Sequence, residues 1–162
     1  MSSPAPKPAT GLSKLYTRPG FLLRRAHQIS VAVFEEECRQ LQLTPAQFGV
    51  LTVLEARPGL GQSSLARALG FDKVTVLRVL RGLASRGLVE RRSEAGKRSV
   101  HVVLTPEGER LLASARLPAE RAYRRLMAPL DARQQAQFIA MLQQLTGALE
   151  GQARAAFEPP GP

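Results

Sequence analysis

The residues with the clearest chemical bias lie between positions 61 and 98, where basic side chains outnumber acidic ones. Nine are basic: Arg67, Lys73, Arg78, Arg81, Arg86, Arg91, Arg92, Lys97 and Arg98. Three are acidic, so this stretch holds +6 of the formal net charge of +10 carried by all 162 residues. Neutralisation of phosphates needs positive charge concentrated in this way, which indicates a polyanionic partner, either nucleic acid or an anionic membrane. A solvated basic surface is the alternative, because charge alone specifies no partner.

A helix expected over residues 73–86 carries the most specific of these candidate contacts. Four side chains share its exposed N-terminal face: Lys73, Val74, Thr75 and Arg78. The N-terminal turn of a helix in the major groove presents such side chains to base edges. Arg78 suits a bidentate pair with guanine, and Val74 or the methyl group of Thr75 suits contact with a thymine methyl. Leu77 lies beside this face, where it either contacts a thymine or packs on the preceding helix.

Two further parts of the basic stretch are candidate DNA contacts. Ser63 lies at the start of the short helix expected before residue 70. Lys97 and Arg98 belong to a charged loop, 93–99, that joins two expected strands. An arginine at the tip of such a hairpin can enter a narrow, electronegative minor groove. Alternatively, these charges only keep an exposed loop soluble.

The remaining reactive residues do not assemble into a catalytic or metal-binding motif. With one cysteine and two histidines, the chain has no intramolecular disulfide and no zinc site of four cysteine and histidine ligands. We find no Ser-His-Asp arrangement and no glycine-rich phosphate loop, so the sequence predicts neither an enzyme nor a cofactor. Cys38 is either a redox sensor or a structural thiol. The glutamates at 35–37 favour the structural role, because acidic neighbours raise the pKa of a thiol.

The elements that must position these residues follow from apolar spacing and capping residues. Helices are expected over 19–42, 44–57, 62–70 and 73–86, and strands over 88–92 and 100–104. A fifth helix follows Thr105, with a kink or interruption at Pro118, and Asp131 begins a sixth. The predicted fold is therefore mainly α with a small β-hairpin wing, the order of elements in a winged helix-turn-helix.

The two ends of the chain differ in composition from the part between them. Residues 1–18 begin with prolines that alternate with small residues, which predicts a flexible N-terminal arm. Residues 156–162 contain three prolines and a glycine, which predicts a frayed C-terminus. Neither a signal peptide nor a run of about 20 apolar residues is found, so we expect a cytoplasmic protein without a membrane partner.

Several segments, taken together, resemble one known family. Residues 65–76 read LARALGFDKVTV, residues 86–91 read RGLVER, and residues 103–108 read VLTPEG. This spaced combination, with Arg78 and Leu83, resembles the MarR family of bacterial transcription regulators over about residues 20–149. One departure lies in the wing, where Gly96 stands in place of the family's usual aspartate.

The resemblance implies a single MarR-type domain over residues 19–155, with a DNA-binding part and a dimerisation part. It implies a DNA-binding winged helix over about 43–105 and dimerisation helices over about 19–42 and 106–155. It further implies a homodimer that reads a pseudo-palindromic operator, usually as a repressor. A small-molecule pocket is implied between the dimerisation helices and the DNA-binding part.

Residues 15–29, LYTRPGFLLRRAHQI, resemble family members that respond to aromatic carboxylates or their coenzyme A thioesters. The implied candidate contacts are Tyr16, Arg18, Phe21, Arg25 and His27. Arg18, Arg25 or the neighbouring Arg24 would pair with a carboxylate, His27 would hydrogen-bond a ring substituent, and Tyr16 or Phe21 would stack on the ring. Alternatively, the arginines are surface charges and His27 lies half-buried in the dimer interface.

These expectations combine into one hypothesis about function. The chain is expected to be a DNA-binding repressor of a catabolic or efflux operon, released from its operator by an aromatic acid or aromatic acyl-CoA. Its expected partners are double-stranded DNA, a second copy of itself and the effector. The alternatives are a redox-sensing regulator that acts through Cys38 and an adaptor that uses the winged helix for protein contacts.

Overall fold

A computed structural model describes residues 11–93 and 100–161 of the chain. The elements follow the order α1 (Gly11–Tyr16), α2 (Pro19–Glu37), the 3-10 helix η1 (Arg39–Leu41), α3 (Pro45–Ala56), β1 (Leu60–Gly61), α4 (Gln62–Leu69), α5 (Lys73–Ser85), β2 (Val89–Ser93), β3 (Val100–Leu104), α6 (Pro106–Met127), α7 (Ala132–Leu149) and the 3-10 helix η2 (Glu150–Gln152). The predicted class, mainly α with a small wing, is confirmed.

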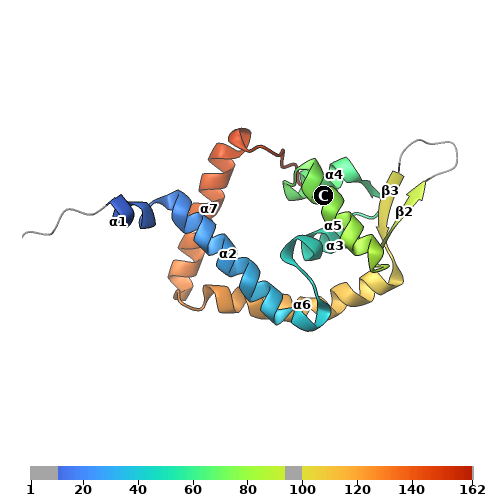
Figure 1. Cartoon of the computed structure of the whole chain (residues 1–162), viewed down its shortest axis with the longest axis horizontal. Coiled ribbons are helices and arrows are strands. Elements are labelled where there is room, and N and C mark those ends of the chain that lie inside the picture. Colours follow the sequence, from blue (N-terminus) through green and yellow to red (C-terminus); the bar gives the residue numbers. More distant parts are fainter. Residues whose placement is uncertain (1–10, 94–99, 162) are drawn as a thin grey trace, which may run out of the picture.

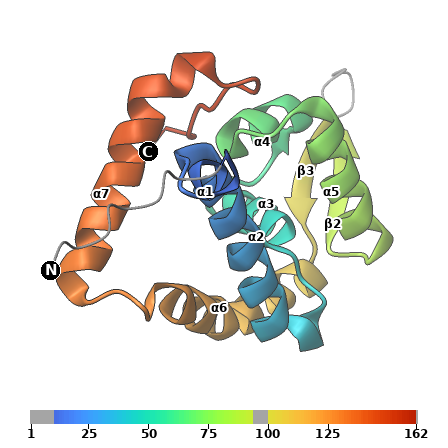
Figure 2. The same ribbon diagram turned by 60° about the vertical axis from the view of Figure 1, so that its left-hand side comes forward.

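The helices divide into two groups that share α6. Helices α3, α4 and α5 pack together beside the small sheet, and the C-terminal part of α2 packs against α6 at an oblique angle (Figure 1). Helix α7 stands away from the α3–α5 group in both ribbon views (Figure 2). None of the 18 residues of α7 is buried, so this helix contributes little to the core of the single chain.

Predicted caps explain where four of the helices begin. The Thr44 hydroxyl accepts a hydrogen bond from the backbone N–H of Gln47, and the Gln47 side chain accepts one in return, which completes a capping box at α3. Asp131 forms the same box at α7, while Asp72 and Thr105 cap α5 and α6. Each bond satisfies a backbone donor that the first turn of a helix leaves without a partner.

One hydrophobic core joins the α3–α5 group to the sheet and to α6. Its fully buried members include Leu51 and Leu54 of α3, Leu65 of α4, Leu83 of α5 and Leu112 of α6. Val76, Val79 and Leu80 are buried beside Leu83 on the same side of α5. Burial of such side chains stabilises the fold by about 1.5–3 kcal/mol each, so the core gives the DNA-reading candidates a rigid base.

The sheet has three antiparallel strands in the order β1-β3-β2. Val89 of β2 pairs with Leu104 of β3, and Leu60 of β1 pairs with Val102. The hairpin was predicted, whereas β1 was not, because two residues are too few for a periodic pattern to form.

Expectations about the two termini need correction, and one of the alternatives at Pro118 is decided. Residues 11–16 of the predicted flexible arm form α1, although none of their side chains is buried. Helix α6 continues through Pro118, so the interruption is excluded and the kink stays a prediction; Ala115 and Ala119 on either side are buried in the core. Residues 156–161, predicted to fray, contact α4 through Glu158.

Across residues 11–93 and 100–161, no helix combines the length and the apolar character needed to cross a bilayer.

Candidate nucleic-acid interface and effector cleft

Helices α4 and α5 form a helix-turn-helix with a tight connection. Gly70 ends α4 in the left-handed conformation at φ +62°, and the backbone N–H of Phe71 donates to the carbonyl of Ala66 at 2.8 Å. The chain then extends through Asp72, whose carboxylate accepts from the N–H of Thr75 at 2.6 Å. The turn therefore fixes the direction in which the N-terminus of α5 leaves the core.

The N-terminal face of α5 is open, as the sequence predicted. Lys73 and Arg78 are exposed, and Val74 is 74% exposed, which is high for a β-branched apolar side chain. Thr75 is half-buried, and Leu77 is half-buried beside it. Base edges in the major groove are read by such side chains: a cation, a methyl group that contacts thymine and an arginine that can bind guanine through two hydrogen bonds.

An exposed face of α4 offers two more polar side chains. Ser63 and Arg67 are both exposed and are four residues apart, so they lie on the same side of the helix. In a helix-turn-helix the first helix crosses the DNA backbone. Ser63 was predicted as a DNA contact, whereas Arg67 was counted only as part of the basic stretch.

The described part of the wing carries exposed arginines and is joined by a hydrogen bond to the loop before β1. Arg91 and Arg92 of β2 are exposed, and Arg92 pairs with Glu90 on its own strand. The ring nitrogen Nδ1 of His101 lies 2.7 Å from the carbonyl oxygen of Gly59, which joins β3 to the loop before β1. The predicted tip contacts Lys97 and Arg98 lie outside the described residues.

A cleft of about 820 Å³ separates α2 from the α3–α5 group. Helix α2 lines it with His27, Val31 and Glu35, which are spaced by four residues and so share one face. Helix α5 lines the opposite side with Thr75 and Arg78, two of the predicted DNA readers. Further walls are mostly apolar and come from α3, α4 and the turn: Pro45, Ala46, Gly49, Leu69 and Phe71. A molecule bound there would contact α2 and the reading helix together.

A second cavity, of about 500 Å³, lies on the other side of α2. Leu23, His27 and Ile29 of α2 face Leu126 of α6 and Phe138 of α7 across it. His27 therefore lines both cavities.

Comparison with known proteins decides the family. The sequence model described as the MarR family matches residues 41–99. The HTH-type transcriptional repressor NicR of Pseudomonas putida is 32% identical over 128 residues, which cover 78% of this chain and 80% of NicR. The chain belongs to the MarR family. This confirms the resemblance drawn from residues 65–108 and makes the chain a helix-turn-helix transcription regulator.

Solved structures of MarR-type regulators have the same fold. The repressor CouR bound to p-coumaroyl-CoA superposes with a TM-score of 0.76 at 32% identity, covering 87% of this chain and 99% of CouR. CouR bound to a 23-mer DNA duplex gives 0.74 at 33% identity, covering 88% and 99%. BpsR of Bordetella bronchiseptica, whose DNA binding is regulated by 6-hydroxynicotinic acid, gives 0.72 at 30% identity, covering 78% and 97%.

In this MarR-family chain the five predicted effector contacts separate into two groups. His27 lines both cavities, as described above. Tyr16, Arg18, Phe21 and Arg25 line neither cavity. The rings of Tyr16 and Phe21 pack on each other with centroids 5.2 Å apart, and the guanidinium of Arg24 lies 5.1 Å from the Phe21 ring. Arg25 donates to the Gln28 side chain at 3.0 Å. These four residues all lie at or near the N-terminus of α2, outside both cavities, and form the second group.

Several cleft residues were missed by the sequence reasoning. Val31 and Glu35 follow His27 at intervals of four, a signal that was available in the sequence. Leu69 and Phe71 were not predicted to line a cleft. Their part in the cleft depends on how α2 packs across the DNA-binding module, which no local pattern contains.

Cys38 has the surroundings of a structural thiol. Its side chain is fully buried at the end of α2, within the core cluster that includes Phe34 and Leu43. Burial raises the pKa of the Cys38 thiol, against the attraction of Arg121, and Glu37 raises it further. A buried thiol with a raised pKa carries little thiolate, the form that reacts with oxidants, so the geometry does not favour the redox alternative. No cluster of potential metal ligands occurs in the part of the chain that the structure describes.

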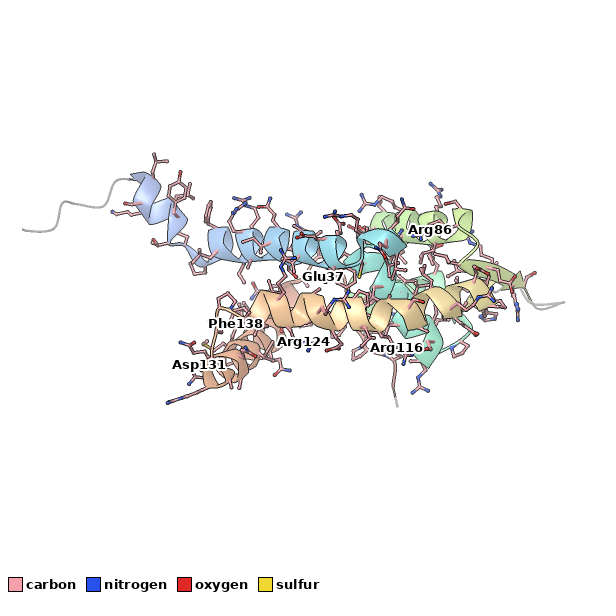
Figure 3. All side chains as sticks on the ribbon, turned by 90° about the horizontal axis from the view of Figure 1, so that it is seen from below. Glu37, Arg86, Arg116, Arg124, Asp131 and Phe138 are labelled. Atoms are coloured by element: carbon pink, nitrogen blue, oxygen red, sulfur yellow. The ribbon has the colours of Figure 1, made fainter. Side chains whose placement is uncertain are left out.

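Ion pairs join α6 to α2 and to α3. Figure 3 labels one residue of each pair, Glu37 on α2 and Arg116 on α6. Glu37 of α2 accepts from Arg121 at 3.0 Å and Arg125 at 3.4 Å, and these two guanidinium groups lower the pKa of its carboxyl. Glu55 of α3 accepts two bonds from Arg116 at 2.7 and 2.8 Å. Helix α6 thereby connects α2 with α3 of the helix-turn-helix region.

Proposed function

We propose that the chain represses transcription as a homodimer and is released from its operator by an aromatic carboxylate or its coenzyme A thioester. The observation that carries this proposal is the cleft in which His27 of α2 faces Thr75 and Arg78 of α5. The same two side chains of α5 are candidates for reading DNA. A ligand in the cleft would thus act directly on the reading helix.

The charge distribution supports double-stranded DNA as the macromolecular partner. Lys73, Val74 and Arg78 lie on the open end of α5, and Ser63 lies on the α4 face that would follow the phosphate backbone. Arg98 and Lys97 of the wing would add minor-groove contacts. Two copies related by two-fold symmetry would place their α5 helices about 34 Å apart, one duplex turn.

The apolar surface of α7 supports the homodimer. Ile139, Met141, Leu145 and Leu149 are each more than two-fifths exposed, and no residue of α7 is buried. A helix with this much apolar surface is stabilised mainly by burial against another element. Leu12 and Leu15 of α1 are exposed as well, so α1 also offers apolar surface to a second copy.

The composition of the cleft supports an aromatic acid as effector. Its apolar walls suit an aromatic ring, while Arg78 offers the geometry that pairs with a carboxylate and His27 offers a hydrogen bond. The ligands named with CouR and BpsR, p-coumaroyl-CoA and 6-hydroxynicotinic acid, both carry aromatic rings. Such a ligand releases DNA only to the extent that it binds the DNA-free arrangement more tightly. The proposed target is an operon for the catabolism or efflux of such compounds, and the protein would act on it in the cytoplasm.

Fluorescence anisotropy tests both halves of this proposal. The purified protein is titrated onto DNA from upstream of its own coding sequence and onto a scrambled duplex, at several salt concentrations. We expect selective binding with a steep salt dependence. Benzoate, p-coumarate, 6-hydroxynicotinate and p-coumaroyl-CoA are then added to the complex, with cyclohexanecarboxylate as the non-aromatic control. Release by an aromatic compound but not by the control supports the proposal. Equal binding to both duplexes, or no binding at low salt, contradicts the DNA half and favours the adaptor alternative.

A further inference from the structure

The segment that follows α7 crosses to the DNA-binding module and binds along α4 (Figure 1). The carboxylate of Glu158 lies 3.1 Å from Nε of Arg67. The backbone N–H of Glu158 also donates to the carbonyl oxygen of Arg67 at 2.9 Å. One residue of the segment thus binds both the side chain and the main chain of one α4 residue.

Two further contacts extend this attachment in both directions along the segment. Phe157 lies against Gly70: a Cβ added at Gly70 would be in van der Waals contact with the Cβ of Phe157, at 3.8 Å. Arg57, at the C-terminal end of α3, donates to the carbonyl oxygen of Gly161. The segment is therefore held at three places on the module, which is more than one surface ion pair would provide.

The position of Arg67 gives this attachment a functional meaning. Arg67 lies four residues after Ser63 on the same exposed side of α4. The proposed function places that side along the phosphate backbone, because the first helix of a helix-turn-helix crosses it. The Glu158 carboxylate accordingly occupies a guanidinium that would otherwise be available to a DNA phosphate.

We propose that residues 153–161 are a built-in competitor for DNA, with the Glu158 carboxylate standing in for a backbone phosphate at Arg67. This inference rests on the proposed function, since it needs α4 to face DNA. Displacement of the segment by a phosphate frees α4 for the operator, whereas its return favours the DNA-free protein. Both partners are substantially exposed, with side-chain exposures of 46% for Arg67 and 69% for Glu158, so the pair is weak enough for DNA to displace.

The proposal predicts tighter DNA binding when the competitor is removed. Glu158→Gln removes the charge, and a chain shortened to end at residue 155 removes the attachment. We expect Glu158→Gln to bind the operator duplex roughly two- to fivefold more tightly, the range of an exposed ion pair. The shortened chain should bind at least as tightly as Glu158→Gln, because it also loses the contacts of Phe157 and Gly161. The dependence of log affinity on log salt should steepen by up to about 0.9 for each phosphate that Arg67 gains. Glu150→Gln is the matched control, because it removes the same charge upstream of the attached segment.

The double variant Arg67→Ala with Glu158→Gln separates competition at Arg67 from a general effect of charge. Competition predicts that Glu158→Gln tightens binding in the wild-type background and has no effect when Arg67 is absent. Thermal unfolding of each variant confirms that it folds. The inference is overturned if Glu158→Gln binds no more tightly than Glu150→Gln, or if the shortened chain binds DNA more weakly. Loss of selective binding by the wild type itself would instead overturn the proposed function.

Discussion

The carboxylate of Asp72 accepts a hydrogen bond from the backbone N–H of Thr75 at a distance of 2.6 Å, and this bond closes the first turn of α5. It satisfies a donor that the start of a helix leaves free, and it places a negative charge at the positive end of the helix dipole. Lys73 and Val74 lie between the two bonded residues. The hydrogen bond between Asp72 and Thr75 therefore fixes the direction in which the Lys73 and Val74 side chains project.

The stability supplied by Asp72 should depend on pH. The hydrogen bonds from Thr75 hold the pKa of the Asp72 carboxyl below its ordinary value. A carboxyl with a lowered pKa in the folded state stabilises that state above its unfolded pKa and loses this effect as pH falls through the folded pKa. We expect Asp72→Ala to lower the thermal midpoint at pH 7, and the difference from wild type to shrink below about pH 3.9.

Asp72→Asn is the control, since asparagine keeps the acceptor without the charge. It should unfold closer to the wild type than Asp72→Ala does. Scanning calorimetry between pH 2.5 and 7 measures all three proteins. A difference between wild type and Asp72→Ala that persists unchanged at the lowest pH would refute the assignment.

Arg78 is expected to carry base specificity rather than general affinity. Arg78→Ala should cost about 1–3 kcal/mol at one base position and reduce discrimination between operator and scrambled DNA. Arg78→Lys keeps the charge but loses the bidentate geometry, so it should lose discrimination as well. Arg110→Ala on α6 removes the same charge outside the DNA-binding module and should leave discrimination unchanged. Competition binding against single-base operator variants provides the measurement. Helix α5 is not the reader if Arg78→Ala discriminates as the wild type does.

Local signals were sufficient to predict most of the fold. Four helices begin directly after a residue whose hydroxyl or carboxylate caps them: Thr44, Asp72, Thr105 and Asp131. These starts could be predicted because a cap depends only on neighbours within three residues. The β1 strand escaped prediction because Leu60–Gly61 pairs with β3, about 40 residues away in the sequence. The attachment of residues 156–161 escaped for the same reason, since Arg67 and Gly70 lie some 90 residues upstream.

The candidate site shows the same division between local and distant information. The exposure of Lys73, Val74 and Arg78 followed from the period of α5 and agrees with the structure. The cleft lies where the resemblance implied a pocket, between α2 and the DNA-binding part. Most of its lining did not follow from local sequence, because its walls come from α2, α3, α4 and α5. His27 was predicted as an effector contact from a resemblance, and the structure adds that it faces two cavities. Whether it binds an effector remains a prediction.

Cys38 should be unreactive while the protein is folded. Its burial and raised pKa predict that a thiol reagent labels it slowly in the native state and rapidly in urea. Hydrogen peroxide should leave operator binding unchanged in the wild type and in Cys38→Ala. Labelling kinetics and anisotropy after peroxide treatment provide the two measurements. If peroxide releases DNA from the wild type and not from Cys38→Ala, the redox alternative is correct and the assignment of an organic effector loses its basis.

Gly108 is required by the approach of α6 to the chain before β2. A Cβ at this position would overlap the carbonyl oxygen of Leu88, a backbone atom that cannot rotate away. Gly108→Ala should therefore reduce the free energy of unfolding by about 1–3 kcal/mol or more, the usual cost of overpacking. Gly147→Ala in α7 meets nothing within 4 Å and serves as the control. That change should be neutral or stabilising, because alanine favours a helix by roughly 1 kcal/mol over glycine. Urea unfolding of both variants tests the contrast, and equal midpoints would contradict it.

Substitutions at His27 and Arg25 separate two accounts of effector recognition. If the cleft beside Thr75 and Arg78 binds the effector, His27→Ala should raise the effector concentration needed for half-release by about 2- to 12-fold, the value of one hydrogen bond. Its operator affinity without effector should be unchanged, since His27 is not among the proposed DNA contacts. Arg25→Ala, which alters the second group of predicted contacts near the start of α2 instead, should leave the effector response unchanged. The measurement is the release of labelled operator DNA across an effector titration for all three proteins. A response lost in Arg25→Ala and retained in His27→Ala would move the effector site from the cleft to this second group, which includes Tyr16 and Phe21.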